Sequence, residues 1–274
     1  MTNVELSKHD INVLEKIKDP ESNPAAGVLI DTSLPRDPNI ADEKVYDQIV
    51  AKEREIIQVI QRLETQLSWS MSEEATASTV EDYKACTKRF DDLVTEYPNY
   101  ASARNNRAQL NRRLYGDAML LSETSGMPMP LIEQPDHAEK LKASTLVLGD
   151  LERSISLLSP PSLTTPMSPQ AARTLSMAHT QRAAVYLKTA KLISHRSLDM
   201  DGDRKESQWT KVAFEEGASR DLAYGGRYGN QIAKGLAVSV NPTAKLCGQI
   251  VREAMKKEYG PAFGDPEEPE GSSQ

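Results

Sequence analysis

Long apolar runs and cysteines are both scarce in this chain of 274 residues. No apolar run approaches the roughly 18 residues that a membrane-spanning helix needs, and residues 1–18 are too polar for a secretory signal. Its two cysteines, Cys86 and Cys247, cannot form a disulfide framework. We therefore expect a reduced, cytoplasmic protein, with access to the nucleus left open, and no contact with a membrane.

Aromatic residues and positive charge are also in short supply. Aromatics make up 5% of the chain, hydrophobic residues make up 38%, and no stretch alternates as a strand would, which favours an all-α core rich in alanine and leucine. The formal net charge of −7 argues against binding to nucleic acid, because such binding depends on neutralising phosphates. None of the four histidines has a partner at metal-ligand spacing, so we expect no metal and no cofactor; they are His9, His137, His179 and His195.

Prolines and glycines divide the chain into three regions. Residues 1–40 predict a short helix, with Asp10 as its N-cap, followed by a proline-rich linker. Residues 41–259 predict a helical domain interrupted by loops at 122–136, 160–169 and 194–207, and residues 260–274 predict a disordered acidic tail. Within the domain we expect helices at 41–67, 79–97, 101–115, 138–158, 170–193, 209–224 and 231–238, and a last helix that begins at Asn241-Pro242.

A helix-turn-helix pattern recurs three times in this domain. Its second helix calls for a small residue, an aromatic residue four positions later, a small or apolar residue after three more and then a helix-ending proline, as in Cys86, Phe90, Leu93 and Pro98. The other residues assigned to packing between repeats are Ala108, Val147, Leu151, Ala183, Tyr186, Phe214 and Gly217. Phe90 and Leu151 are 61 residues apart against a period of roughly 34, and the predicted loops account for the excess. We therefore predict an all-α, three-repeat tetratricopeptide (helix-turn-helix) solenoid with a C-terminal capping helix, and a generic helical bundle is the alternative.

Four stretches of the chain resemble one tetratricopeptide family. They are Asp10 to Pro20, Ala101 to Gln109, Asp150 to Ile155, and the segment Asn241-Pro242 to Ile250, which is the most specific. In order and content they are similar to the tetratricopeptide repeat protein 36 family, from which this chain departs by its long loops. The resemblance implies a non-enzymatic adaptor, a chaperone partner of the Hsp70 type and a connection with tyrosine metabolism.

The first helices of such repeats line a concave surface, which is the predicted binding site. On the second repeat Ser102, Asn105, Asn106, Gln109, Arg112 and Arg113 share one face by helical spacing, and Gln181 and Lys188 occupy matching positions on the third. We expect the amide side chains to pair with the backbone of an extended peptide, and Arg112 or Arg113 to pair with an acid. The third repeat has Met177 and Gln181 where carboxylate clamps have lysine and arginine, so capture of an acidic C-terminal tail is not expected. The alternative is that this polar face is simply solvated and binds no ligand.

Two other functions stay open at this stage. An enzyme with an unfamiliar helical site would need His179, Cys86 and an acid to converge, whereas we expect both cysteines to be buried and inert. A structural subunit would dock through the apolar stripe of Val13, Leu14 and Ile17. The segment from Gly225-Gly226 to Asn230 is interpreted as a helix break, since no strand precedes it as a phosphate-binding loop requires. The oligomeric state does not follow from the sequence.

Overall fold

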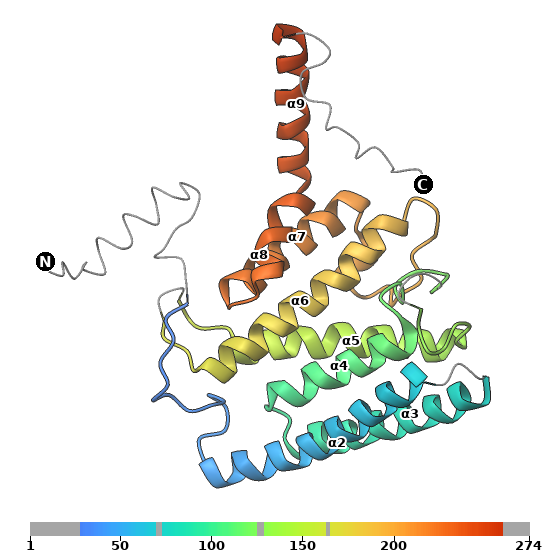
Figure 1. Ribbon diagram of the computed structural model, residues 1–274, viewed down its shortest axis with the longest axis vertical. Coiled ribbons are helices and arrows are strands. Elements are labelled where there is room, and N and C mark those ends of the chain that lie inside the picture. The colour runs from blue at the N-terminus through green and yellow to red at the C-terminus, as the bar shows by residue number, and fades with distance from the viewer. Residues whose placement is uncertain (1–27, 70–72, 125–128, 163–164, 260–274) are drawn as a thin grey trace, which may run out of the picture.

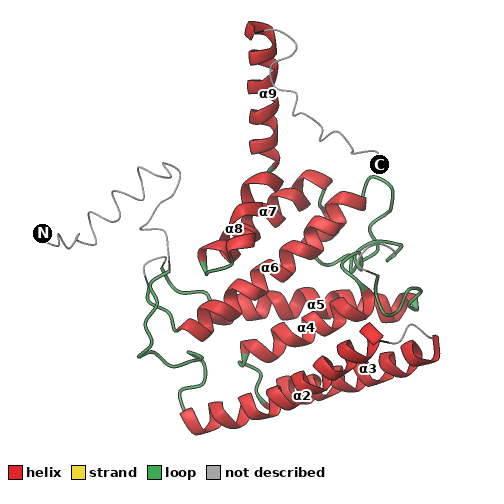
Figure 2. Ribbon diagram, in the orientation of Figure 1, coloured by secondary structure: helices red, strands yellow, loops and turns green. Residues whose placement is uncertain are grey.

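The computed structural model describes residues 28–69, 73–124, 129–162 and 165–259. Within these ranges the chain is all-helical and contains no strand (Figure 2). The α-helices are α2 (Glu43–Trp69), α3 (Glu73–Glu96), α4 (Ala101–Tyr115), α5 (His137–Leu158), α6 (Pro169–Leu192), α7 (Lys211–Arg227), α8 (Gln231–Val240) and α9 (Pro242–Tyr259). A short 3-10 helix, Lys205–Gln208, lies in the predicted loop between α6 and α7.

Short polar side chains begin most of these helices. Asp136, Ser168 and Thr210 each accept a backbone N–H from the first turn of α5, α6 and α7, respectively. Asn241 caps α9 by accepting the N–H of Ala244 at 3.1 Å, which confirms the predicted start of the last helix. The helix boundaries therefore follow from local capping chemistry that is readable in the sequence.

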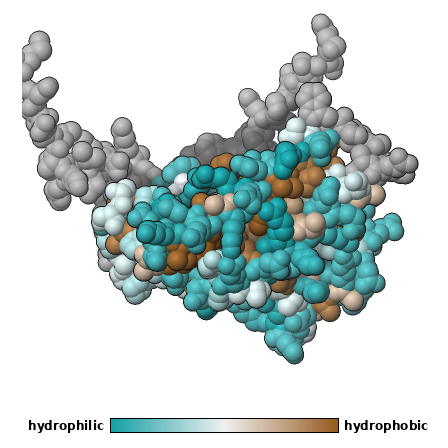
Figure 3. All heavy atoms as spheres, turned by 90° about the horizontal axis from the view of Figure 1, so that it is seen from below, coloured by the Kyte–Doolittle hydropathy of each residue, from teal (hydrophilic) through white to brown (hydrophobic). Residues whose placement is uncertain are grey.

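Each helix packs against the next along the chain, and α4 also contacts α6 (Figure 1). The residues assigned to packing between repeats are buried, except for Pro98, which is exposed at the end of α3. Among them Tyr186 and Phe214 have ring centroids 5.8 Å apart, and a side chain at Gly217 would press on Trp209. Most of the face seen in Figure 3 is hydrophilic, with hydrophobic residues gathered in small patches.

The predicted helix break lies within the segment from Gly225-Gly226 to Asn230, because α7 ends at Arg227 and α8 begins at Gln231. The two glycines themselves do not form it, since both lie in the last turn of α7. A Cβ on Gly226 would lie only 2.7 Å from the Cα of Lys234, and a Cβ on Gly225 would lie 2.7 Å from the hydroxyl of Thr180. The two glycines therefore allow α8 and α6 to approach the backbone of α7 closely.

Residues 28–40, predicted as linker, lie against the helical body. Met167 and the segment around Ile30 form a parallel bridge, in which the N–H of Asp31 donates to the carbonyl of Met167 at 2.9 Å. Asn39 donates to the carbonyl of Leu157, and the carboxylate of Asp37 accepts the first N–H of α4. This segment therefore connects the start of α4 with the end of α5 and with the residues just before α6.

The last helix does not cap the array in the way that the sequence analysis expected. It is α8 that packs on α7, whereas α9 projects away from the body (Figure 1). Cys247, predicted to be buried on the inner face of this helix, is exposed, while Cys86 is buried as expected. The reason is that Asn241 alone connects α8 to α9, which is too short a connection for α9 to fold back along α8.

The predicted N-terminal helix and the acidic tail lie outside the described residues. The loops 122–136 and 194–207 join each other, because the N–H of Ser122 donates to the carbonyl of Ser197 at 3.0 Å and the guanidinium of Arg196 donates to the carbonyl of Glu123 at 2.9 Å. No helix in the described ranges has the length and apolarity to cross a membrane.

Candidate functional site

A groove of about 930 Å³ runs between α2 and α4, and α3 and the loop before α5 complete its walls. Its apolar lining comes from Ile57 and Ile60 of α2, Leu110 of α4, and Met129 and Pro130 of the loop. Its polar lining is made of Gln61, Glu64, Thr65, Tyr83, Asn106, Gln109, Arg112, Arg113 and Asp117. The predicted loop 122–136 thus forms one end of the groove and does not lie apart from it.

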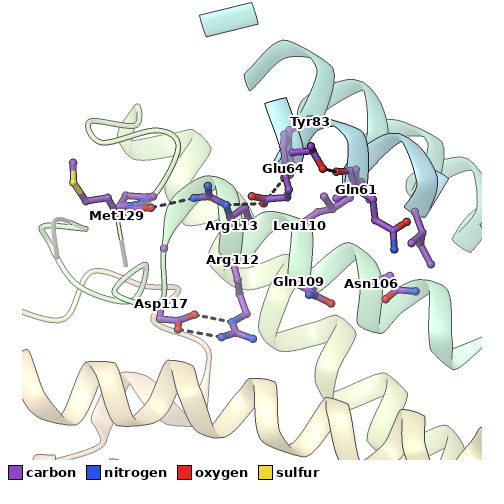
Figure 4. A pocket seen from close by; sticks show the side chains of 15 residues that line it. Gln61, Glu64, Tyr83, Asn106, Gln109, Leu110, Arg112, Arg113, Asp117 and Met129 are labelled. Atoms are coloured by element: carbon purple, nitrogen blue, oxygen red, sulfur yellow. Dashed lines mark hydrogen bonds and ion pairs between the residues drawn. The ribbon is translucent and has the colours of Figure 1, made fainter. Parts of the chain in front are cut away.

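Amide side chains gather along the middle of the groove. Asn106 and Gln109 lie beside one another on α4, and Gln61 faces them from α2 (Figure 4). Each amide offers both a donor and an acceptor, which is what the backbone of an extended peptide requires. The groove therefore combines an apolar surface with neutral hydrogen-bonding groups.

Both arginines in the groove already have carboxylate partners (Figure 4). Arg112 forms two parallel bonds with Asp117 at 2.7 and 3.0 Å, and it donates to the amide oxygen of Gln181 at 3.2 Å. Arg113 donates to Glu64 at 2.9 Å and to the carbonyl of Met129 at 3.2 Å. The acids that we expected a ligand to supply come from the chain itself, so this end of the groove is electrostatically balanced.

A buried carboxylate supports the opposite end. Glu53 of α2 accepts hydrogen bonds from Asn106 at 2.7 Å and from the hydroxyl of Tyr100 at 2.6 Å. Burial raises the pKa of Glu53 above its ordinary value, and the hydrogen bonds from Tyr100, Ser102 and Asn106 offset only part of this effect. The same burial and the neighbouring carboxylate raise the pKa of Tyr100. This network fixes the side chain of Asn106 at the groove.

The structure brings together four of the eight predicted groove residues, namely Asn106, Gln109, Arg112 and Arg113. Asn105 and Gln181 face each other instead: both are buried, and the Gln181 amide donates to the Asn105 side chain at 2.6 Å. They join α4 to α6, so the predicted surface is divided where these helices meet. Ser102 bonds Glu53 below the groove, and Lys188 lies along α6 outside it.

The walls that α2 and the loop supply to the groove are not among the residues predicted from the sequence. The regular apolar stripe of the helix predicted at 41–67 includes Ile56, Ile60 and Leu63, and it could have indicated a wall, but the stripe alone does not say which face stays open. Met129 and Pro130 carry no signal of this kind, because their position depends on how the loop returns across Gly116.

Two buried acids form matching clusters with basic residues in successive helix pairs. Asp150 of α5 binds Arg107 of α4 through two bonds of 2.7 Å, and Asp221 of α7 binds Arg182 of α6 in the same way. His179 also meets Asp221, with its Nδ1 at 2.8 Å, and its ring stacks on Tyr224. His179 thus reaches an acid, as the enzyme alternative requires, but the position of this acid matches the repeated ion pair.

No group of three His, Cys, Asp or Glu residues among the described residues could hold a metal ion. The candidate site is the groove, and the class of protein that the fold defines is an all-helical protein whose helices pack against their neighbours along the chain.

Comparison with known proteins identifies the family. Over 255 residues the chain is 36% identical to the L-tyrosine degradation gene cluster protein hmgX of Aspergillus fumigatus, and the match covers 92% of this chain and 93% of that protein. The chain therefore belongs to the hmgX family. No family model and no solved structure matches the chain. The resemblance to the tetratricopeptide repeat protein 36 family stays a prediction.

Proposed function

We propose that the protein is a non-catalytic binding partner in tyrosine catabolism, built as a tetratricopeptide-type array whose α2–α4 groove holds an extended segment of another protein. The observation that carries this proposal is the groove itself, with amide groups of α4 and α2 beside an apolar floor. The link to tyrosine catabolism rests on the relative, whose printed name places it in an L-tyrosine degradation gene cluster.

The repeated acid clusters support the tetratricopeptide assignment. Arg107 and Arg182 occupy the same place in the predicted repeats, and each binds a buried aspartate on the following helix at 2.7 Å. Equivalent long-range pairs in successive helix pairs are what an array of related units would contain. A generic bundle gives no reason for the pairing to recur.

The groove chemistry narrows the class of ligand. Because Asp117 and Glu64 already neutralise the two arginines, the groove favours an internal, neutral segment with an apolar side chain over an acidic C-terminal tail. The Hsp70-type partner implied by the resemblance would present such a tail, so an internal segment of a metabolic enzyme is the preferred ligand.

An array of overlapping 15-residue peptides from the enzymes of tyrosine catabolism would test the proposal. Peptides that bind the full chain are then titrated by fluorescence anisotropy against Gln61→Arg/Gln109→Arg, which places two cations on the groove, and against Gln66→Arg, an exposed change on α2 outside the groove lining. We expect the double variant to lose at least about tenfold in affinity, a factor equivalent to about 1.4 kcal/mol, and Gln66→Arg to bind as the wild type does. Absence of any binding peptide, or equal affinity in all three proteins, would rule the groove out.

A further inference from the structure

Of the three amide side chains in the described lining of the groove, Asn106 is held by the protein itself. Gln61 and Gln109 are exposed, and neither forms a hydrogen bond within the described ranges. Each can therefore rotate and offer either its donor or its acceptor to a ligand. Asn106 is half-buried, and its Nδ2 donates to a carboxylate oxygen of Glu53 at 2.7 Å. It lacks the freedom of the two glutamines.

Glu53 decides which end of the Asn106 amide turns toward it. The Glu53 side chain is buried, and it accepts hydrogen bonds from the Asn106 amide, from the Tyr100 hydroxyl at 2.6 Å and from the Ser102 hydroxyl. A carboxylate accepts hydrogen bonds and donates none. If the amide turned over, its oxygen would face that carboxylate, and two acceptors would lie in contact without a hydrogen between them. Asn106 therefore keeps its nitrogen on Glu53.

The oxygen of the same amide is left for the groove. It has no partner among the described residues, and within these residues no buried polar side-chain atom lacks a partner. The Asn106 oxygen is therefore accessible, and Asn106 lines the groove beside Gln109 (Figure 4). Because Glu53 holds the nitrogen from outside this lining, the oxygen is a fixed acceptor on the groove wall.

A fixed acceptor selects ligands by the polarity of the group placed against it. The N–H of a peptide bond satisfies the Asn106 oxygen, whereas a carbonyl or carboxylate oxygen at the same point leaves two acceptors unpaired. Proline has no N–H, so it cannot satisfy this oxygen either. Gln61 and Gln109 impose no such rule, because they can turn to either polarity.

We propose that Asn106 determines the specificity of the groove: its oxygen takes the backbone N–H of one residue of the bound segment, and that residue is never proline. Glu53 is a positioning residue, since it acts on the ligand through the orientation of Asn106. This inference rests on the proposed function, because it requires a segment bound in the groove. It adds a rule to that function, since the same fixed oxygen turns away the carboxylate of a chain terminus.

Heteronuclear NMR of side-chain amides tests the orientation of Asn106 in the free protein, without any ligand. We expect the amide hydrogens of Asn106 to exchange with water at least about tenfold more slowly than those of Gln109, because Asn106 is bonded to a buried carboxylate. In Glu53→Gln either end of the new amide can face Asn106, so this difference should shrink. The matched control is Glu55→Gln, an exposed change on α2 that removes a pair with Arg89 outside the groove and should leave the exchange unchanged. Equal exchange for Asn106 and Gln109 in the wild type overturns the proposal.

Ester substitution tests the N–H in the ligand. In a peptide that binds the full chain, each backbone N–H in turn is replaced by an oxygen, which removes one donor and keeps the chain length. We expect one position at which the affinity of the wild type falls at least about tenfold, because the Asn106 oxygen then faces another oxygen. With Glu53→Gln the Asn106 amide can turn its nitrogen to the ester, so the loss should shrink to about threefold or less, and Glu55→Gln should behave as the wild type does. Asn106→Ala is the second variant, since the ester loss should disappear without the acceptor.

The outcomes distinguish this inference from the proposed function. Circular dichroism that matches the wild type establishes that the variants are folded. A peptide that binds in the groove but has no ester-sensitive position, or an ester loss that neither Glu53→Gln nor Asn106→Ala reduces, overturns the role of Asn106 and leaves the groove as the binding site. Absence of any binding peptide overturns the proposed function and this inference together.

Discussion

Arg107 shows how burial decides the worth of an ion pair at the scale of a single residue. It bonds Asp150 and Asp91 at the same distance, 2.7 Å, yet the Asp150 side chain is 2% exposed and that of Asp91 is 49% exposed. Water screens the second pair, and a half-exposed ion pair contributes little to stability. The first cannot be broken without leaving cationic groups of Arg104 and Arg107 short of a counter-charge inside the protein.

We therefore expect Asp150→Asn to lower the free energy of unfolding by about 3–5 kcal/mol, as for other buried pairs that lose one partner. Asp91→Asn should cost about 1 kcal/mol or less, because water replaces the lost charge. Urea denaturation of the two variants beside the wild type measures both values. Equal losses would mean that burial does not separate the two pairs.

The pKa values of two glutamates beside the groove are shifted in opposite directions. Burial raises the pKa of Glu53 above its ordinary value of 4.5. The unfolded chain then loses this proton at a lower pH than the folded chain does, so the contribution of Glu53 to stability falls as the pH rises from about 4.5 through the folded value. Glu53→Gln should accordingly gain in unfolding free energy relative to the wild type over this rise in pH.

Glu64 is the matched control at the other end of the groove. Burial raises its pKa, but hydrogen bonds from Arg113 and Tyr83 outweigh that effect and lower it below 4.5. Its stabilising contribution is present above that value and is lost as the pH falls through the folded pKa. Glu64→Gln should therefore cost stability at pH 7 and progressively less as the solution is acidified. Chemical denaturation between pH 3 and 7, roughly the range over which carboxyl groups titrate, measures both effects. The account is wrong if the unfolding free energies of both variants, relative to the wild type, change with pH in the same direction.

At this scale the sequence predicted the identity of four groove residues but not the carboxylates with which two of them pair. Helical spacing places Asn106, Gln109 and Arg113 on one face, because that relation is local. Glu64, which neutralises Arg113, lies 49 residues away on α2, so no local pattern relates it to α4. Asp117 follows Arg112 by five residues, but it lies in the turn after α4 and outside the helical spacing that defined the predicted face. Arg112 and Arg113 therefore have partners within the chain, and the pairing of either arginine with an acid of a ligand stays a prediction.

At the scale of elements, the pair Gly225-Gly226 is a contact surface between helices. Ala at position 226 would place its Cβ 2.7 Å from the Cα and 2.8 Å from the N of Lys234, and backbone cannot yield as a flexible side chain can. We expect Gly226→Ala to lower the free energy of unfolding by about 1–3 kcal/mol, the usual cost of overpacking.

Gly149, within α5, is the control for this change. A side chain there meets nothing within 4 Å, so Gly149→Ala should raise the free energy of unfolding by about 0.5–1 kcal/mol through helix propensity alone. Thermal denaturation of both variants distinguishes close approach from propensity. A stabilising effect at both positions would show that α7 and α8 need no glycine between them.

Helix boundaries were predictable to within a few residues wherever a cap is encoded locally, as at Asp136, Ser168 and Asn241. The direction of a helix is a different matter. The expected capping role of the last helix fails because one residue, Asn241, controls the angle between α8 and α9, and a periodic apolar pattern contains no information on that angle.

At the scale of the whole molecule, the long loops and the segment 28–40 hold the helix pairs in register. The loops 122–136 and 194–207 meet beside the bridge between Leu121 and Leu198, and the segment 28–40 bridges to Met167. The sequence marked all three as breaks between helices, since proline and glycine signal irregular backbone. It could not show that they bind one another, because such contacts join residues 77 to 137 positions apart.

The segment 28–40 allows the last prediction. It bonds the body through Asp31 and Met167, through Asn39 and the carbonyl of Leu157, and through the Ser168 hydroxyl and the carbonyl of Arg36 at 3.1 Å. A chain without residues 1–40 loses these bonds and the cap on α4, whereas a chain without residues 1–27 keeps them. We expect the shorter chain to have a free energy of unfolding lower by about 2 kcal/mol or more, since a single hydrogen bond contributes about 1 kcal/mol. Hydrogen exchange should accelerate first in the opening turns of α4 and α6, where the lost partners were seated. Exchange that is the same in both truncated chains would show that this segment lies on the body without stabilising it.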